Sequence, residues 1–133
     1  MIADTSAYIP LFVTHPLAVP ASTAVGDGRP LHVPEFSLIE AANTLWKYGI
    51  QGGMSSADIK VTLGAIRTQM TVWPDMPLLE DAAEIALGLR HPVYDCLFIA
   101  LALQRGEPLA TADRKLAEVA RRAGVEAVLI EAG

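Results

Sequence analysis

The sequence predicts an α/β fold, in which a short and mostly parallel sheet is covered by helices on both faces. Short apolar stretches alternate along the chain with segments whose apolar residues recur at helical spacing, and this alternation is typical of parallel sheets. Hydrophobic residues make up 52% of the 133 residues, and the mean hydropathy is +0.35, which is enough for a real core. No repeat, low-complexity tract or linker divides the chain. We therefore expect one domain spanning residues 1–133.

The first elements are expected to be short. The stretch "MIA" at 1–3 reads as a strand, and either Thr5 or Ser6 is expected to cap the helix that follows. Pro10 falls early in that helix. The next helix is the least regular element, because prolines and "GDG" interrupt its sequence.

A second strand, "LHV" at 31–33, precedes a longer helix. Pro34 is expected to begin this helix, since proline is favoured at the first helical position, and "GG" at 52–53 breaks it. Its apolar positions predict one buried face, made of Leu38, Ala41, Ala42, Leu45, Trp46 and Ile50.

The remaining chain continues the alternation of helices and strands. Ser55, followed three residues later by Asp58, predicts a capping box at the start of the next helix. The elements expected after it are a strand "TVW" at 71–73 stopped by Pro74, a helix from Pro77 to Arg90, an apolar helix containing Asp95, a strand "PLAT" at 108–111, a helix from Arg114 to Ala123 closed by Gly124, and a strand "VEAVLI" at 125–130.

Composition excludes several classes of protein. The single cysteine cannot form an internal disulfide, and the three histidines lack metal-ligand spacing, so a zinc site is not expected. The apolar run at 96–103 is far shorter than the roughly 20 residues of a membrane span. No Lys or Arg precedes Arg29, so the basic region of a signal peptide is missing and a cytoplasmic location is expected. The net charge of −5 argues against a broad basic face for nucleic acid.

Three aspartates stand where an apolar stretch meets a helix: Asp4, Asp95 and Asp113. A carboxylate at a helix N-terminus interacts favourably with the free N–H groups and the macrodipole, which is a sufficient explanation for each one separately. The carboxyl ends of parallel strands also form the ligand crevice of α/β sheets, where these aspartates are expected. Glu40 follows the second strand near the same rim, although its helical face resembles an ordinary solvated surface. The four carboxylates are therefore candidates to converge.

Convergence of four carboxylates would need a cation or retained protons. Two unit charges about 5 Å apart at an effective dielectric near 20 repel by roughly 3 kcal/mol. Oxygen ligands without Cys or clustered His select Mg²⁺ or Mn²⁺. A metal held in this way can polarise a phosphoryl oxygen and stabilise a leaving oxygen. The chemistry implied is phosphodiester hydrolysis.

The motifs "MIADTSA", "EAANTLWK", "VYDCLFIALAL" and "LATADRKL" together resemble the PIN-domain family, and most closely its VapC-type toxins of toxin–antitoxin pairs. The resemblance covers essentially the whole chain, with the four motifs in the family's order. It implies a three-layer α/β/α sandwich and a metal-dependent ribonuclease. The acidic quartet around Mg²⁺ or Mn²⁺ would be Asp4, Glu40, Asp95 and Asp113.

The same resemblance assigns supporting residues and partners. The hydroxyls of Ser6 and Thr111 would support the carboxylates or bound water, and Asn43 occupies a frequent accessory position. The resemblance also implies a homodimer and a cognate antitoxin that lays a basic side chain into the acidic site. An Arg fork suits such a pocket, because it pairs with carboxylates in a bidentate way.

The RNA substrate needs local contacts, since the chain is acidic overall. Arg114 and Lys115, beside Asp113, are candidate phosphate contacts, although a solvated helix face is the more common role for such residues. Trp46 and Trp73 are expected in the core or a dimer interface rather than as platforms for RNA bases.

Other functions fit the sequence less well. A haloacid-dehalogenase-like phosphatase needs a second Asp two residues after the first, where this chain has Ser6. A response-regulator receiver expects an acidic pair after the first strand and a Lys near the last, and this chain has neither. The remaining alternative is a catalytically silent PIN-like scaffold that only binds a protein partner.

Overall fold

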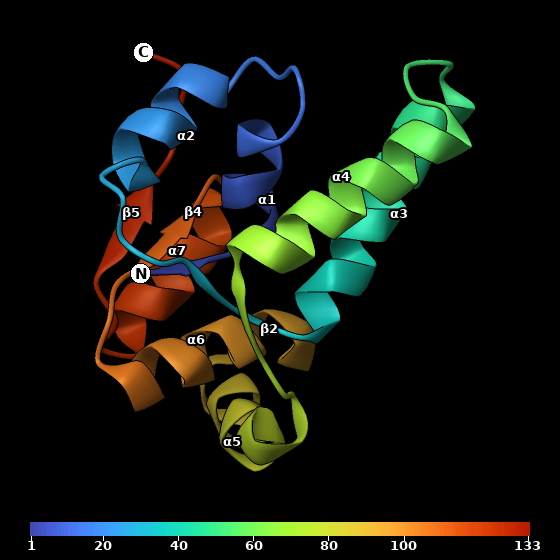
Figure 1. Ribbon diagram of the computed structural model, residues 1–133. Coiled ribbons are helices and arrows are strands. Elements are labelled where there is room, and N and C mark those ends of the chain that lie inside the picture. Colours follow the sequence, from blue (N-terminus) through green and yellow to red (C-terminus); the bar gives the residue numbers. More distant parts are fainter.

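The computed structural model describes residues 1–133 and has three layers, with a five-stranded sheet between two layers of helices (Figure 1). This confirms the α/β sandwich expected for the chain. The strands are β1 (Ile2–Ala3), β2 (His32–Pro34), β3 (Thr71–Trp73), β4 (Leu109–Thr111) and β5 (Ala127–Leu129).

All neighbouring strands are parallel, in the order β3-β2-β1-β4-β5. The central strand β1 pairs with β2 on one side and with β4 on the other, with Ile2 opposite both His32 and Leu109. The chain therefore leaves β1 toward one edge of the sheet and returns to build the other edge. A ligand crevice is expected outside the carboxyl ends of strands at such a switch point.

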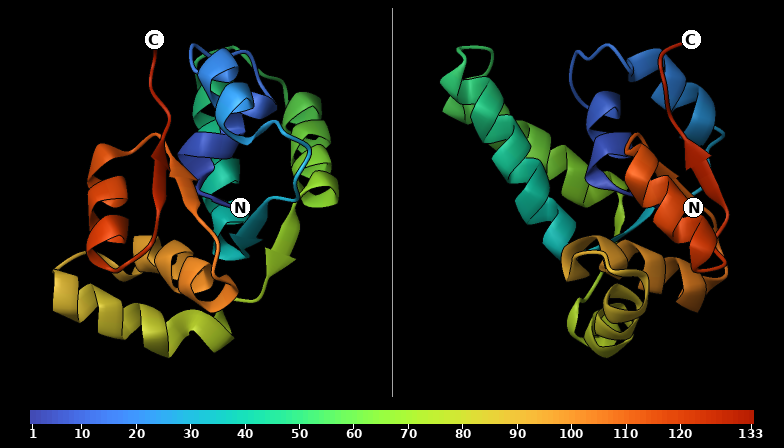
Figure 2. Two further views of the ribbon diagram at one scale, coloured as in Figure 1. Left: turned by 90° about the vertical axis from the view of Figure 1, so that its left-hand side faces the viewer. Right: turned by 180° about the vertical axis from the view of Figure 1, so that it is seen from behind.

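Alternating side chains of the strands divide the core into two halves. Ile2 and Leu109 belong to the half formed with α5 (Leu79–Leu89), α6 (Val93–Arg105) and α7 (Arg114–Arg122). Ala3, Val33 and Ala110 belong to the other half, formed with α1 (Thr5–Tyr8), α2 (Ala18–Val25), α3 (Phe36–Ile50) and α4 (Ser56–Gln69). Figure 2 shows the two groups of helices on opposite sides of the strands. Two short 3₁₀ turns, η1 (Ile9–Leu11) and η2 (Met76–Leu78), complete the fold.

Several helix ends follow the sequence prediction. Ser55 and Asp58 form the expected capping box at the start of α4, with Asp58 N–H donating to Ser55 Oγ and Ser55 N–H donating to the Asp58 carboxylate. Gly124 directly follows the C-cap of α7 at a φ of 88°, a backbone conformation that favours glycine. No single helix is long and apolar enough to cross a membrane. Only two consecutive helical segments taken together, Met76–Leu89 and Val93–Arg105, have the length and apolar composition of a span, and they are bent by 114° relative to each other.

Other helix starts were predicted wrongly. Asp4 caps α1, where Thr5 or Ser6 was expected, because its carboxylate reaches the N–H of Ala7. Pro34 ends β2, and α3 begins at Phe36, whose N–H donates to Asp75 Oδ1 from the segment after β3. The start of this helix is therefore held by a long-range hydrogen bond, which the local sequence cannot reveal.

The predicted inward face of α3 is wrong toward its C-terminal end. Ala41 and Leu45 are buried as expected, whereas Trp46 is 54% exposed and Ile50 is 72% exposed. The far half of α3 projects from the body of the molecule and packs against α4 (Figure 1). Trp46 is therefore not a core residue.

Candidate active site

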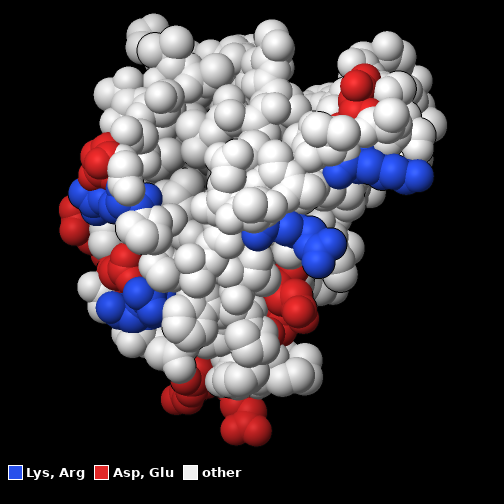
Figure 3. Space-filling model, viewed as in Figure 1, with Lys and Arg blue, Asp and Glu red and all other residues white.

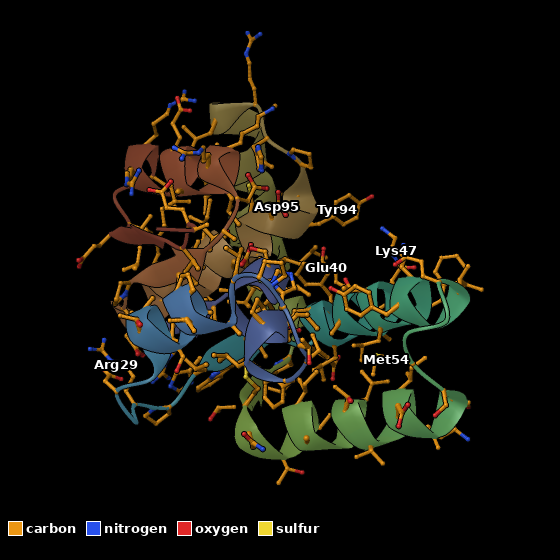
Figure 4. The ribbon with its side chains drawn as sticks, turned by 90° about the horizontal axis from the view of Figure 1, so that it is seen from above. Arg29, Glu40, Lys47, Met54, Tyr94 and Asp95 are labelled. Carbon is orange, nitrogen blue, oxygen red and sulfur yellow. The ribbon has the colours of Figure 1, made fainter.

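Asp4, Glu40, Asp95 and Asp113 all line one cavity of about 490 Å³ at the carboxyl ends of the central strands. They come from the end of β1, from α3, from the first turn of α6 and from the turn between β4 and α7. Figure 4 shows Glu40 on α3 facing Asp95 at the start of α6. The fold thus brings together four carboxylates that are widely separated in the sequence.

Asp4 is the most buried of the four and the most constrained. Its Oδ1 accepts hydrogen bonds from Ser6 Oγ at 2.7 Å and from the N–H of Ala7 at 3.0 Å, and its Oδ2 accepts one from Thr111 Oγ1 at 2.7 Å. Burial raises the pKa of Asp4 from 3.8 to about 6; these hydrogen bonds oppose the rise, and the negative charge of Asp95 adds to it. The carboxylate is therefore fixed in place but costly to ionise.

Ser6 and Thr111 form a hydroxyl network that joins the start of α1 to the end of β4. The Ser6 hydroxyl accepts a hydrogen bond from the N–H of Ala112 at 2.9 Å, and the Thr111 hydroxyl accepts one from the N–H of Asp113 at 3.0 Å. Each hydroxyl in turn donates its proton to Asp4, Ser6 to Oδ1 and Thr111 to Oδ2. Both side chains therefore contact the first of the four carboxylates.

Glu40 is half-buried, although its helical face looked like a solvated one in the sequence. Its Oε1 accepts a hydrogen bond from Thr5 Oγ1 at 2.9 Å. Burial raises the pKa of Glu40, and the negative charge of Asp95 adds to this effect. Asn43 and Lys47, one and two turns further along α3, also line the cavity. The polar face of this helix therefore forms a wall of the site, and periodicity alone could not distinguish that wall from an ordinary surface.

Asp95 and Asp113 both stand at helix N-termini, in two different ways. Asp113 is the N-cap of α7, and its Oδ1 accepts hydrogen bonds from the N–H groups of Lys115 and Leu116. Asp95 makes no hydrogen bond to the backbone of its own helix and instead pairs with His91, with 2.7 Å between Asp95 Oδ2 and His91 Nε2. The helix-capping explanation thus holds for Asp113 and not for Asp95.

The donor set suits a hard divalent cation. The cavity offers carboxylate oxygens and no thiolate, the combination that favours Mg²⁺ or Mn²⁺ over zinc. No three Asp, Glu, His or Cys side chains lie close enough together to enclose an ion by themselves. Mg²⁺ commonly keeps several of its waters and takes only one or two protein carboxylates. The residues therefore fit a hydrated cation rather than a closed protein cage.

The structure places the predicted phosphate contacts, Arg114 and Lys115, outside the acidic cavity. Arg114 pairs with Glu131, and neither Arg114 nor Lys115 lines the cavity. The basic side chains that line it are Lys47 and His15. Lys47 lies seven residues after Glu40, two turns further along α3, and this spacing is the signal from which it could have been found.

A second and larger cavity, of about 800 Å³, adjoins the acidic one. His15 and Tyr48 line both cavities. The larger cavity contains none of the four acids and lies between the loop after η1 and the α3–α4 hairpin, with Phe12, Val13, Met54 and Val61 among its apolar lining. The four carboxylates therefore lie together in the smaller of the two cavities.

Known proteins resemble this chain in sequence and in fold. Ribonuclease VapC3 of Pyrobaculum aerophilum is 31% identical over 121 residues, which span 89% of this chain and 92% of that protein. A crystal structure of a P. aerophilum protein has a TM-score of 0.71 at 24% identity, over 96% of this chain and 82% of its own. A toxin–antitoxin complex from Klebsiella pneumoniae has a TM-score of 0.72 at 16% identity, over 98% of this chain and 97% of its own.

The two structures share the fold, and the family is shown by sequence. The PIN domain family matches residues 1–122, nearly the whole length of the chain and all four acidic segments. This match, together with the relative at 31% identity, means that the chain belongs to the PIN-domain family.

Proposed function

We propose that this protein is a Mg²⁺- or Mn²⁺-dependent endoribonuclease and the toxin of a toxin–antitoxin pair. The observation that carries the proposal is the gathering of Asp4, Glu40, Asp95 and Asp113 around one cavity at the switch point of the sheet. The relative that spans most of the chain is named a ribonuclease, which supports RNA as the substrate.

The four carboxylates divide into different roles in this proposal. A bound divalent ion would polarise the scissile phosphate and offset the negative charge of the pocket. Asp4, Asp95 and Asp113 would hold this ion directly or through water. Glu40, whose pKa is raised by burial, is suited to orient the attacking water and take its proton. Ser6 and Thr111 keep Asp4 from rotating, as their hydrogen bonds to both of its oxygens indicate.

Contacts with RNA would be local rather than spread over a basic face. The Lys and Arg side chains visible in Figure 3 lie in separate small groups, with no continuous basic patch on that face. Lys47 lines the acidic cavity and has no ion-pair partner. We therefore assign the phosphate contact nearest the site to Lys47, in addition to the expected contacts of Arg114 and Lys115 outside the cavity.

The two adjoining cavities suit an antitoxin segment. Its basic side chain would enter the acidic cavity, where an Arg fork can pair with carboxylates. Its apolar side chains would lie in the larger cavity against Phe12, Val13 and Met54. The solved toxin–antitoxin complex with the same fold supports an antitoxin as the partner.

A homodimer belongs to the same proposal. Ile39, Trp46 and Ile50 form an exposed apolar stripe along α3, with 74%, 54% and 72% of their surfaces exposed. A stripe of this kind can pack against its own copy about a two-fold axis. The cytoplasmic location expected from the sequence stays a prediction.

The test is metal-dependent cleavage of RNA by the purified protein. We expect structured RNAs to be cut in the presence of Mn²⁺ or Mg²⁺ and to stay intact in EDTA, and we expect Asp4→Asn to abolish cleavage. An Asp4→Asn protein that cleaves RNA as the wild type does would contradict the mechanism. A wild-type protein that binds an antitoxin and never cleaves RNA would favour the silent scaffold.

A further inference from the structure

His91 stands in the tight connection between α5 and α6 and is held there by its backbone. The residue before it, Arg90, has a left-handed backbone with a φ of 55°, and the residue after it, Pro92, is the N-cap of α6. The N–H of His91 donates to the carbonyl of Ala86 at 3.1 Å. The side chain is only 5% exposed. The position of the imidazole is therefore determined by two packed helices.

The two ring nitrogens of His91 have opposite environments. Nε2 lies 2.7 Å from Asp95 Oδ2. Nδ1 is buried and is the one buried side-chain nitrogen or oxygen atom in the molecule without a hydrogen-bond partner. A buried N–H without an acceptor is rarer in proteins than a buried acceptor without a donor. The ring proton therefore belongs on Nε2, where it is donated to Asp95.

An unsatisfied buried nitrogen costs stability, so the ring needs another reason to be there. An apolar ring such as Phe would fill the same space without a polar atom left unpaired. What only the imidazole supplies is the hydrogen bond at Nε2. The unpaired Nδ1 therefore suggests that histidine stands at this position for the hydrogen bond between Nε2 and Asp95.

No other group in the structure holds the Asp95 carboxylate. Asp95 is the third residue of α6, from which an acidic side chain commonly reaches back to the N–H of the N-cap residue. Here the N-cap is Pro92, which has no N–H. Asp4 and Glu40, by contrast, are held by Ser6, Thr111 and Thr5.

We propose that His91 is a positioning residue for Asp95. Its Nε2–H occupies Oδ2 from the interior side, fixes the rotamer of the carboxylate, and leaves Oδ1 as the oxygen available to the cavity. The inference rests on the proposed function, because it supposes that Asp95 binds the divalent ion. Outer partners of metal-binding carboxylates typically change metal affinity or activity by about 10 to 100-fold when they are removed.

Mn²⁺ binding, measured by the loss of the electron paramagnetic resonance signal of free Mn²⁺, tests the proposal without RNA. His91→Phe keeps a ring and removes the donor, and we expect it to weaken Mn²⁺ binding about tenfold. His91→Gln places an amide N–H near the position of Nε2 and is expected to restore most of the affinity. His32→Phe, at a second buried histidine that does not line the acidic cavity, should bind Mn²⁺ as the wild type does.

A double-mutant cycle with Asp95→Asn separates positioning from a general structural effect. If His91 acts through Asp95, His91→Phe should cause no further loss of Mn²⁺ affinity in the Asp95→Asn background. The same tenfold loss in both backgrounds, or wild-type affinity in His91→Phe itself, would overturn the proposal. A wild-type protein that binds no Mn²⁺ would overturn the proposed metal dependence and this inference with it.

The tautomer provides a second measurement that does not depend on metal or on activity. ¹⁵N-resolved spectra of the histidine side chains, assigned with the His91→Gln variant, should show a proton on Nε2 of His91. A bare Nε2 would leave no donor for Asp95 and would overturn the assignment.

Discussion

Asp4 is a residue at which burial and hydrogen bonding act in opposite directions. Three donors bind its two oxygens, which favours the ionised form, and yet burial is the larger effect and the pKa rises to about 6. The folded state therefore carries a carboxylate whose ionisation it disfavours. Groups of this kind are concentrated at functional sites, because the arrangement that serves the chemistry differs from the one that maximises stability.

The raised pKa of Asp4 predicts a stability that depends on pH in metal-free protein. Between pH 3.8 and about 6 the folded state binds the proton and the unfolded state releases it, so stability falls as the pH rises through this range. The full difference corresponds to roughly 3 kcal/mol. Asp4→Asn removes the charge and keeps a side chain able to cap α1. We expect the free energy of unfolding of Asp4→Asn to be about 1 to 3 kcal/mol larger than that of the wild type near pH 7.5.

Urea denaturation in EDTA, near pH 4 and near pH 7.5, measures this difference. The advantage of Asp4→Asn should be small at the lower pH, where the folded wild type already holds the proton. Glu84→Gln, at an exposed position in the middle of α5, controls for the change in net charge. An advantage of Asp4→Asn that is equal at both pH values would mean that burial of charge is not its cause.

Lys47 provides a prediction about the substrate rather than the metal. A lysine at the cavity wall that contacts a phosphate would contribute to binding RNA and little to the bond-breaking step. Lys47→Met should therefore raise KM for RNA several-fold, leave kcat close to its original value, and flatten the salt dependence of KM. Lys60→Met, on the exposed face of α4, is the matched control. Equal KM values for the two variants would exclude this role for Lys47.

At the scale of elements, Asp113 has two functions that can be separated. It caps α7 through hydrogen bonds to two backbone N–H groups, and its carboxylate lines the acidic cavity. Asn is as good an N-cap as Asp, whereas Ala costs about 1 kcal/mol at such a position. We expect Asp113→Asn to lose RNA cleavage at nearly wild-type stability, and Asp113→Ala to lose both cleavage and about 1 kcal/mol. Thermal melts and cleavage assays of the same preparations measure the two effects. Full activity in Asp113→Asn would show that Asp113 is only a helix cap.

The helix starts and helix faces show which parts of the fold can be predicted from the sequence. Local signals worked where the partner is local, as in the capping box of Ser55 and Asp58. They failed where the partner is distant, as at the start of α3, where Asp75 accepts from the backbone. The helical spacing of Trp46 matches a buried face, but burial also requires a neighbouring element, and spacing carries no information about which part of a helix has one.

At the scale of the whole molecule, the site depends on an order of strands that no local pattern encodes. Asp4 and Thr111 are 107 residues apart in sequence and touch because β1 and β4 are neighbours. The sequence predicted that acids would stand at the carboxyl ends of strands, but strand order decides which of those ends meet. Periodicity therefore could not bring these four carboxylates together, and least of all Glu40, whereas the family resemblance named all four residues that line the cavity.

The apolar stripe of α3 yields the prediction that concerns the assembly. Ile39, Trp46 and Ile50 share one side of the helix, since residues 7 and 4 apart return to nearly the same angle. We expect the protein to have twice the 14.2 kDa chain mass in light scattering. Trp46→Glu combined with Ile50→Glu should give monomers. In a two-fold interface both copies carry the two substitutions, so carboxylates from both chains would be buried against an apolar surface.

Val19→Glu, at an equally exposed apolar position on α2, is the matched control and should leave the dimer intact. A monomeric wild type would remove the dimer from the proposed function, and a dimer that survives the α3 changes would assign it to another surface. Cleavage by the monomeric double variant would then decide whether the second copy is needed for the chemistry. All four acids line a cavity formed by one chain, so we expect that variant to remain active.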